Sequence, residues 1–309
     1  MLADEAPLDR LLIDALRRLS VRLGLAAPYL AGQVAAWQRR LAASPDPADY
    51  FRNPLGFPLL RLPWWLGQTL PPALDASFQA DLVYSSVNGY YFIRLLDNVM
   101  DGHAPAEREL LPALAFFHTE FQSAYQAHFA AGHPFWAYFH AVWFGAAEVT
   151  ARDAGLADID QAAFQQYAAR KVSAAKIPLA AVGWQAGRPE KLEPWAQFVE
   201  TLGAWHQMWN DVFDWNKDLR HGTVTYFLSE ARRRKRPDEP EAAWVVREGF
   251  AWGVAGLQAG LAQAQTQAAA LGSPGLAAYL EQRAALLRQQ QAELAPSLAA
   301  LAQLAVRLA

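Results

Sequence analysis

The sequence contains no cysteine in its 309 residues. A chain without cysteine can have no disulfide framework, no thiolate zinc site and no cysteine nucleophile. Disulfides are rare in the cytoplasm, which is therefore the default location for this protein.

Long hydrophobic runs are also missing. No uninterrupted apolar stretch reaches the ~18 residues that a membrane-spanning helix needs. The first ten residues, MLADEAPLDR, lack the basic segment and apolar core of a signal peptide. We therefore expect a soluble protein.

Charge of either sign is in short supply, since charged residues make up 18% of the chain and the net charge is -3. This balance argues against a nucleic-acid partner, which would call for a basic surface. The short run Arg232–Arg236 is locally basic, and we interpret it as a solvated loop. Hydrophobic residues make up 53% of the chain, which supports a substantial core and excludes global disorder.

Strand-like alternation is scarce as well, whereas helical periodicity runs from Leu74 nearly to the end of the sequence. Glycine and proline predict helix breaks at Gly102–Pro105, Gly132–Pro134, Arg152–Asp158, Gly187–Pro194, Arg236–Pro240 and Gly272–Pro274. No change of composition divides the chain. We predict an all-α fold in a single domain of residues 1–309, with an N-terminal helix and proline-rich segment in 1–73 and a helical core in 74–309.

The first predicted helix covers residues 8–23, where leucines recur at helical spacing and arginines occupy the other faces. A packed amphipathic helix explains this pattern. The alternative is a basic helix that lies on a membrane surface and gives the protein a peripheral membrane contact. After it, seven prolines between Ser44 and Pro72 predict short turns or an ordered loop, held in place by Trp64 and Trp65.

The strongest chemical signal is NDVFDWNKD at Asn210–Asp218. Its four-residue spacing stacks the oxygen-bearing side chains of Asn210, Asp214 and Asp218 along one helix face. Three aromatic residues border that face, which argues against a merely solvated surface: Trp205, Trp209 and Phe213.

A second pair of acids has the same spacing about 110 residues upstream, in YYFIRLLDNVMDG. Asp97 and Asp101 lie one turn apart at the end of an apolar helical run. Two carboxylates so placed repel one another, and a bound cation would reverse the sign of that interaction. Hard oxygen ligands in this number favour Mg²⁺, which is normally held by a few carboxylates and the phosphates of a substrate. The sequence therefore predicts an enzyme that handles a diphosphate.

With both motifs, the chain resembles the class I isoprenoid synthases, the all-helical family of trans-prenyl diphosphate synthases and class I terpene synthases. DNVMD resembles the first aspartate-rich motif, DDxxD, with Asn98 in place of the middle acid. NDVFDWNKD resembles the terpene synthase motif NDxxSxxKE, and also the NDxxD form of the second prenyl synthase motif. The placement of Gly203 and Gln207 before it, and the turn His221–Thr225 after it, agree with the family, and the resemblance covers about residues 80–230.

The resemblance implies a helical bundle with a central active-site cavity. It implies a cluster of three Mg²⁺ ions, replaceable by Mn²⁺, bound by Asp97, Asp101, Asn210, Asp214 and Asp218. It assigns the substrate diphosphate to the basic side chains Lys217, Lys171, Lys176 and Arg94. Aromatic and apolar side chains are expected to line the cavity and stabilise a carbocation: Tyr90, Ile93, Trp136, Trp143, His206, Trp209 and Phe213. His206, His103 or the released diphosphate is the candidate base.

The departures from the family pattern decide between its branches. Chain-elongating synthases carry basic GKRxRP-like and RRG-like segments for a second diphosphate, but here those stretches read FRNPLGFPLLR and GHAPAERELL. We therefore predict a class I terpene synthase that ionises one allylic prenyl diphosphate and then cyclises it or eliminates a proton. The alternatives are a prenyltransferase of the same fold and a non-catalytic, prenyl-binding relative, which the loss of an acid at Asn98 makes plausible. The resemblance also allows a homodimer.

Overall fold

The computed structural model describes residues 5–100, 105–153 and 157–308, and within these ranges its regular structure is helical, with no strand. The predicted all-α fold is confirmed. Among the described helices, none combines the length and apolar character that crossing a membrane requires. The chain forms two compact units, residues 1–139 with 178–192 and residues 140–177 with 193–309. The predicted division into residues 1–73 and 74–309 stays a prediction.

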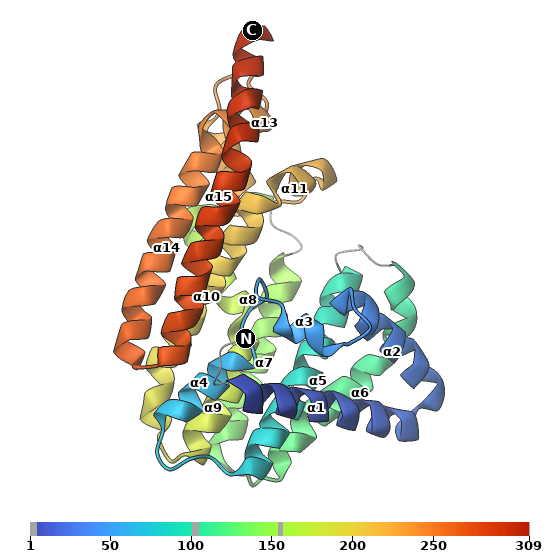
Figure 1. Ribbon diagram of the computed structural model, residues 1–309. Helices are drawn as coiled ribbons and strands as arrows, with labels where there is room; N and C mark the ends of the chain where they lie inside the picture. Colours follow the sequence, from blue (N-terminus) through green and yellow to red (C-terminus); the bar gives the residue numbers. More distant parts are fainter. Residues whose placement is uncertain (1–4, 101–104, 154–156, 309) are drawn as a thin grey trace. The chain divides into compact units, whose positions relative to one another are not determined.

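The first unit is built around α5 (Ala76–Met100), which packs most extensively against α6 and α1 (Figure 1). The proline-rich segment contains only the short helices α3 and α4, which confirms that no long helix forms there. In chain order the elements of this unit are α1 (Ala6–Ala26), α2 (Pro28–Ala42), α3 (Ala48–Arg52), α4 (Arg61–Thr69), α5, η2 (Pro105–Leu110) and α6 (Ala113–Gln126), with the start of α7 (Pro134–Asp153), most of α9 (Lys176–Gln185) and η4 (Pro189–Lys191).

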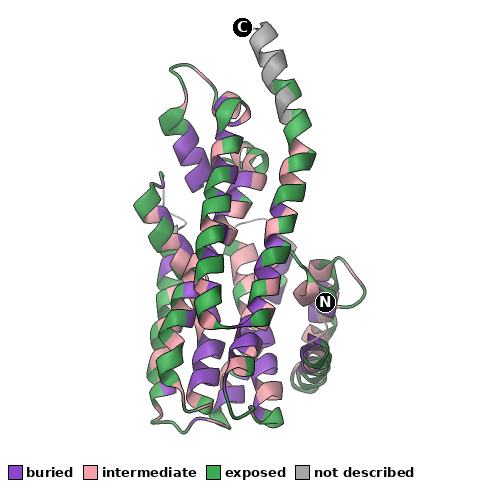
Figure 2. Ribbon diagram, turned by 60° about the vertical axis from the view of Figure 1, so that its left-hand side comes forward, coloured by how far each residue is buried: buried purple, intermediate pink, exposed green. Residues whose placement is uncertain are grey.

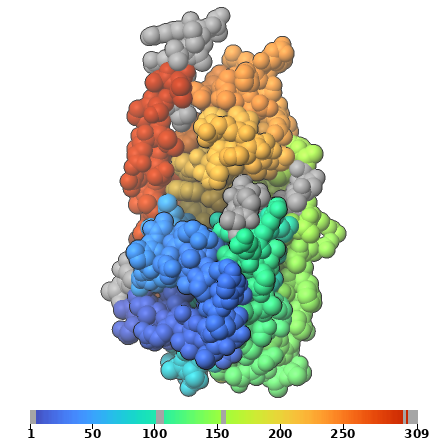
Figure 3. All heavy atoms as spheres, turned by 90° about the vertical axis from the view of Figure 1, so that its right-hand side faces the viewer, coloured from blue at the N-terminus to red at the C-terminus, as the bar shows by residue number. Residues whose placement is uncertain are grey.

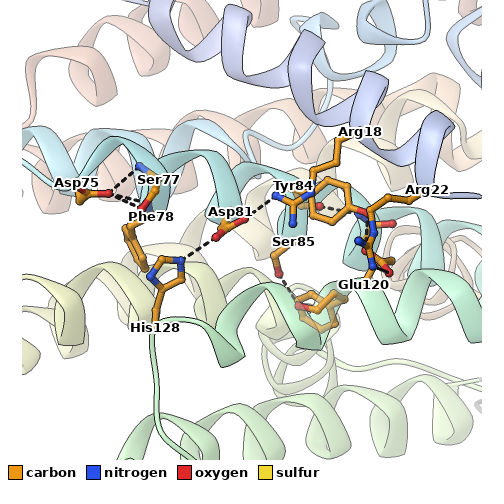
Figure 4. Close-up of polar contacts among 12 residues, drawn as sticks. Arg18, Arg22, Asp75, Ser77, Phe78, Asp81, Tyr84, Ser85, Glu120 and His128 are labelled. Carbon is orange, nitrogen blue, oxygen red and sulfur yellow. Dashed lines mark hydrogen bonds and ion pairs between the residues drawn. The ribbon is translucent and has the colours of Figure 1, made fainter.

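Helix α1 is a packed helix, as its leucine pattern predicts. Its buried residues recur at helical spacing: Leu8, Leu12, Ala15, Leu19 and Leu23. Two of its arginines are used in ion pairs that fix it to α5 and α6 (Figure 4). Arg18 donates to Asp81 at 2.6 Å, and Arg22 donates two hydrogen bonds to the carboxylate of Glu120, at 2.6 and 2.7 Å. The alternative role of this helix at a membrane surface stays a prediction.

The second unit contains the long helices α10 (Leu192–Phe213), α14 (Phe250–Leu271) and α15 (Pro274–Leu308), the last two of which run side by side (Figure 1). Buried residues gather on the inward faces of these helices (Figure 2). The remaining elements are the end of α7, α8 (Gln161–Lys171), η3 (Ser173–Ala175), α11 (Trp215–His221), α12 (Tyr226–Arg234), α13 (Glu241–Trp244) and the π turn η5 (Val245–Gly249).

Most of the predicted helix breaks are confirmed. Chain turns separate α6 from α7, α12 from α13 and α14 from α15 at the expected glycines and prolines. The break predicted at Gly187–Pro194 is shorter, because Pro194 lies in the first turn of α10, where its missing amide hydrogen costs nothing. The breaks predicted at Gly102–Pro105 and Arg152–Asp158 include residues outside the described ranges.

The basic run Arg232–Arg236 is not a loop over its whole length, and that prediction is wrong for its first three residues, which form the last turn of α12. Acidic side chains neutralise these arginines. Arg233 bonds to Asp158 at 2.6 Å, and Arg233 and Arg234 share Glu230 at 2.8 and 2.5 Å. A helix end attracts positive charge, since its last carbonyl groups carry partial negative charge.

Candidate metal and diphosphate site

The NDVFDWNKD motif lies where α10 ends and α11 begins. The single helix predicted for it is wrong, because α10 stops at Phe213 and α11 starts at Trp215, and the chain changes direction between them (Figure 1). Two backbone hydrogen bonds nevertheless continue through the break, from the Asp214 amide to the Asn210 carbonyl at 2.8 Å and from the Asp218 amide to the Asp214 carbonyl at 3.0 Å. The motif therefore keeps the helical spacing of its three oxygen-bearing residues.

These three side chains are accessible. Asn210 and Asp214 are exposed, Asp218 is half-buried, and α11 lies at the molecular surface (gold in Figure 3). Two carboxylates and an amide oxygen are hard ligands that suit Mg²⁺, which keeps waters and binds substrate phosphates besides its few protein ligands. Within the described parts of the chain, no three acidic or histidine side chains converge as a metal site. Binding of Mg²⁺ by the motif stays a prediction.

Asp211, next to the first motif residue, has a structural role. Its carboxylate is 2% exposed and accepts hydrogen bonds from the Gln207 side chain at 2.8 Å and the Tyr226 amide at 3.1 Å. Burial raises the pKa of Asp211 to about 7, and the nearby charge of Asp218 acts in the same direction. Gln207 and Asp211 thus anchor the end of α10 to the start of α12.

The turn between α11 and α12 completes this anchor. Gly222 takes a left-handed conformation with φ of 69°, which a side chain would disfavour, and it ends α11. Thr225 then caps α12, because its hydroxyl accepts the amide hydrogen of Leu228 at 3.2 Å. The turn formed by residues His221–Thr225 therefore brings the backbone amide of Tyr226 to the carboxylate of Asp211.

The break between α8 and α9 packs on the same face of α10 as Asn210. A Cβ atom at Gly203 would lie 2.2 Å from a methyl carbon of Val172, so only glycine permits this approach. Gly203 precedes Asn210 by seven residues, which places it on the same helix face about 10 Å away.

Two lysines predicted to contact the diphosphate flank this break, and both already bond to other side chains. Lys171 donates to the Tyr167 hydroxyl at 3.0 Å. Lys176 forms an ion pair with Glu200 of α10 and is largely buried. Lys217 is exposed on α11, in the motif itself. The structure thus gathers a lysine-bearing break and the Asn210 motif along one face of α10, while their contact with a diphosphate stays a prediction.

Aromatic rings form a ladder along α10 beside the motif. Trp205 and Trp209 have ring centroids 5.2 Å apart, and Trp209 and Phe213 have theirs 4.6 Å apart. His206 packs edge-on against Trp205 and its Nε2 is 3.0 Å from the Tyr279 hydroxyl. Burial, with a smaller contribution from the charge of Arg283, lowers the pKa of His206 well below its usual value, so the imidazole is neutral at pH 7.

The first aspartate motif belongs to the other unit. Asp97 lies in the last turn of α5, 3.4 Å from a guanidinium nitrogen of Arg94, whereas Asp101 and His103 lie outside the described residues. One turn before Asp97, Ile93 is 37% exposed. The prediction that the two motifs share one metal cluster stays a prediction.

Tyr90 lies further back on the same face of α5 as Asp97 and lines a cavity of about 90 Å³. Its hydroxyl is 2.8 Å from that of Tyr50. Burial raises the pKa of Tyr90 well above its usual value, so the phenol keeps its proton. Its assignment to the substrate cavity stays a prediction.

Asn98, which replaces the middle acid, has a defined partner. Its amide nitrogen donates to Glu107 of η2 at 2.9 Å, and Glu107 is buried. An aspartate at this position would set two carboxylates against each other. The amide therefore suits the local structure of this chain.

The two remaining cavity candidates pack tightly. Trp136 donates its indole N–H to the Phe129 carbonyl at 3.1 Å and packs against the rings of Phe135 and Phe139. Trp143 is buried in α7. Their assignment to a substrate cavity stays a prediction.

The sequence interpretation assigned no packing or pairing role to four residues that support the site: Asp211, Gly203, Glu107 and Glu200. Gly203 carried a signal, since a glycine within an apolar helical pattern often marks a close approach. The three acids carried none, because their partners are 15, 9 and 24 positions away in the chain.

Comparison with known proteins finds a solved structure with a similar fold. No family model and no curated protein matches this chain. A crystal structure of a polyprenyl synthase from Roseobacter denitrificans is similar, with a TM-score of 0.55, 14% sequence identity, and coverage of 89% of this chain and 99% of that chain. The chain therefore shares the helical fold of this structure.

Proposed function

We propose that this protein is a Mg²⁺-dependent class I terpene synthase that acts on an allylic prenyl diphosphate in the cytoplasm. The observation that carries the proposal is the alignment of Asn210, Asp214 and Asp218 by continuous i to i+4 backbone bonds across the end of α10. The isoprenoid synthase-like fold supports it.

In this proposal Asn210, Asp214 and Asp218, with Asp97 and Asp101, hold the metal, which when bound neutralises the diphosphate leaving group. Lys217, Lys171, Lys176 and Arg94 add fixed positive charge where negative charge develops as the allylic C–O bond breaks. The rings of Trp209 and Phe213 offer faces that attract a carbocation. Neutral His206, or the released diphosphate, takes the final proton.

A prenyltransferase is the second candidate. The similar solved structure is that of a polyprenyl synthase, which favours a reaction in which the allylic cation is transferred to an acceptor such as isopentenyl diphosphate. The non-catalytic alternative rests on Asn98, whose amide is committed to Glu107.

The deciding experiment measures release of inorganic diphosphate from geranyl, farnesyl and geranylgeranyl diphosphate, each supplied alone, with Mg²⁺ or with EDTA. Asp97→Ala and Asn210→Ala are the test variants. Asn216→Ala is the matched control, because Asn216 is exposed on α11 but outside the stripe of the motif. We expect Mg²⁺-dependent release that both test variants abolish and the control keeps.

Two other results would change the proposed function. Release that requires isopentenyl diphosphate or another acceptor would identify a prenyltransferase. No release under any condition, from protein that is folded by circular dichroism, would leave a binding role.

A further inference from the structure

The second unit contains a cavity of about 620 Å³ between α8, α10, α12 and α14. Its volume lies within the roughly 300–1,000 Å³ of small-molecule sites in proteins. On α10 it is lined by Glu200, Thr201, Ala204, Trp205 and Met208. At 100° per residue, the middle of this set is about 140° around the helix from Asn210. This groove is therefore separate from the motif proposed to bind metal and diphosphate.

Aromatic rings form one end of the groove. The rings of Phe164 and Tyr226 stack with centroids 4.6 Å apart, and Trp252 lies 5.9 Å from Tyr226. The floor between α10 and α14 is open because α14 presents glycines there. A Cβ atom at Gly256 would be 3.5 Å from the terminal methyl of Met208, an ordinary contact, so nothing in the packing requires a glycine.

The charged residues that line the groove are already neutralised. The guanidinium of Arg234 lies over the ring of Trp252 at 4.7 Å and is paired with Glu230. Glu200 is paired with Lys176. A charged ligand would have to break one of these ion pairs, whereas an uncharged one would not. The remaining polar side chains, Gln161, Gln165, Gln263 and Thr201, offer neutral hydrogen-bonding groups at the rim.

From these observations we propose that this groove is a second ligand site, for an uncharged and largely apolar molecule that carries a hydroxyl or carbonyl group. Two contacts couple it to the α10 motif. Tyr226 lines the groove, and its amide is held by Asp211, the neighbour of Asn210. Glu200 lines it too, and holds Lys176 beside the α8–α9 break. A ligand that orders the groove orders both contacts.

The absence of cysteine allows a local test. Gln263→Cys, at the rim, and Ala269→Cys, exposed on another face of α14 two turns beyond the groove, are each labelled with an environment-sensitive maleimide dye. Farnesol, a neutral C15 alcohol, is the probe. We expect a saturable fluorescence change at position 263 and none at position 269.

The blocking variant is Gly256→Leu, whose side chain would occupy the floor of the groove. Because leucine favours a helix more than glycine does, this variant should fold. It should weaken the response at position 263 by about tenfold or more, as expected when a leucine side chain fills apolar space. Ala269→Leu, the matched control on another face of α14, should keep it. No saturable response, or a response that survives Gly256→Leu, overturns the site.

The coupling has its own readout, hydrogen–deuterium exchange in the otherwise unaltered chain. Farnesol should slow exchange in the segments around Tyr226 and in α9, and Gly256→Leu should remove this effect. Binding without slower exchange in those segments overturns the coupling. Neither measurement depends on diphosphate release, so its outcome is separate from that of the proposed function.

Discussion

The carboxylate of Asp211 accepts the backbone amide hydrogen of Tyr226 at 3.1 Å and thereby ties the end of α10 to the start of α12. Only α11 and a short turn separate the two residues in sequence. The bond fixes the backbone directly beside Asn210. It also places a carboxylate in a buried setting, which raises the pKa of Asp211 to about 7.

This raised pKa predicts how stability depends on pH. In the unfolded chain Asp211 loses its proton near 3.8, but in the folded chain it keeps the proton to about 7. Between these values the folded state binds the extra proton, so this residue makes the free energy of unfolding fall as pH rises, by at most about 1.4 kcal/mol per pH unit. Asp211→Asn should remove this slope, because the amide oxygen still accepts the Tyr226 hydrogen bond without ionising.

Urea unfolding of both proteins between pH 5 and pH 8 tests this. The stability of the variant relative to that of the parent protein should rise from pH 5 to about pH 7 and then level off. Parallel curves for the two proteins across that range would contradict the assignment.

The close approach of Val172 to Gly203 predicts a second effect. Gly203→Ala should destabilise the protein by roughly 1–3 kcal/mol, because the added methyl group overlaps a side chain in a packed interface. Gly145→Ala is the matched control, since a Cβ atom there meets nothing within 4 Å, and it should stabilise α7 by up to about 1 kcal/mol. Thermal unfolding compares them. Adding Val172→Ala should restore part of the stability lost in Gly203→Ala. If Gly203→Ala and Gly145→Ala changed the stability equally, the close contact between Gly203 and Val172 would be refuted.

Much of this fold could be predicted from the sequence because its signals are local. The leucine spacing of residues 8–23 identified the buried face of α1, and glycines and prolines located the breaks that follow α6, α12 and α14. The motif at Asn210–Asp218 was also local, since residues four apart share a helix face whatever surrounds the helix.

What the sequence could not supply depended on partners far along the chain. Helix α10 ends at Phe213, and the chain then turns back so that the amide of Tyr226 reaches Asp211. The helical pattern of the sequence continues past Phe213 and gives no sign of this end. The arginines of α12 read as a solvated run because Asp158, the partner of Arg233, is 75 positions away. Lys176 likewise gave no sign of its pairing with Glu200.

The ion pairs of α1 predict unequal costs for two similar substitutions. The Glu120 side chain is 7% exposed and bonds to Arg22 and Tyr84, whereas Asp14 and Arg17 form a pair that is 66–70% exposed. Glu120→Gln should lower the free energy of unfolding by roughly 1–3 kcal/mol at pH 7, less than for a fully buried pair because Arg22 is half exposed. Asp14→Asn should change it by no more than about 0.5 kcal/mol.

Their pH dependence should differ as well. Burial by itself would raise the pKa of Glu120, but the bonds from Arg22 and Tyr84 outweigh it and lower the pKa. The stability that Glu120 contributes is therefore present above its unfolded pKa of 4.5 and is lost as pH falls through the lower folded value. Urea unfolding at pH 7 and pH 3 measures both effects, and a Glu120→Gln deficit that is as large at pH 3 as at pH 7 would argue against the ion pair as its cause.

The bond between Asn98 and Glu107 predicts what restoring the family's middle acid would do. Asn98→Asp removes the amide donor and sets a second carboxylate 2.9 Å from the first, so the hydrogen bond survives only while one of the two keeps a proton. The variant should therefore be less stable than the parent protein at pH 8, by roughly 1–3 kcal/mol, and nearly as stable at pH 5. Adding Glu107→Gln should recover the loss at pH 8, because glutamine supplies a donor to the new acid. If the site binds Mg²⁺ as proposed, the ion should raise the unfolding temperature of Asn98→Asp more than that of the parent protein.

A loss of stability in Asn98→Asp that is equal at pH 5 and pH 8, and that Glu107→Gln does not change, would mean that Asn98 has another role.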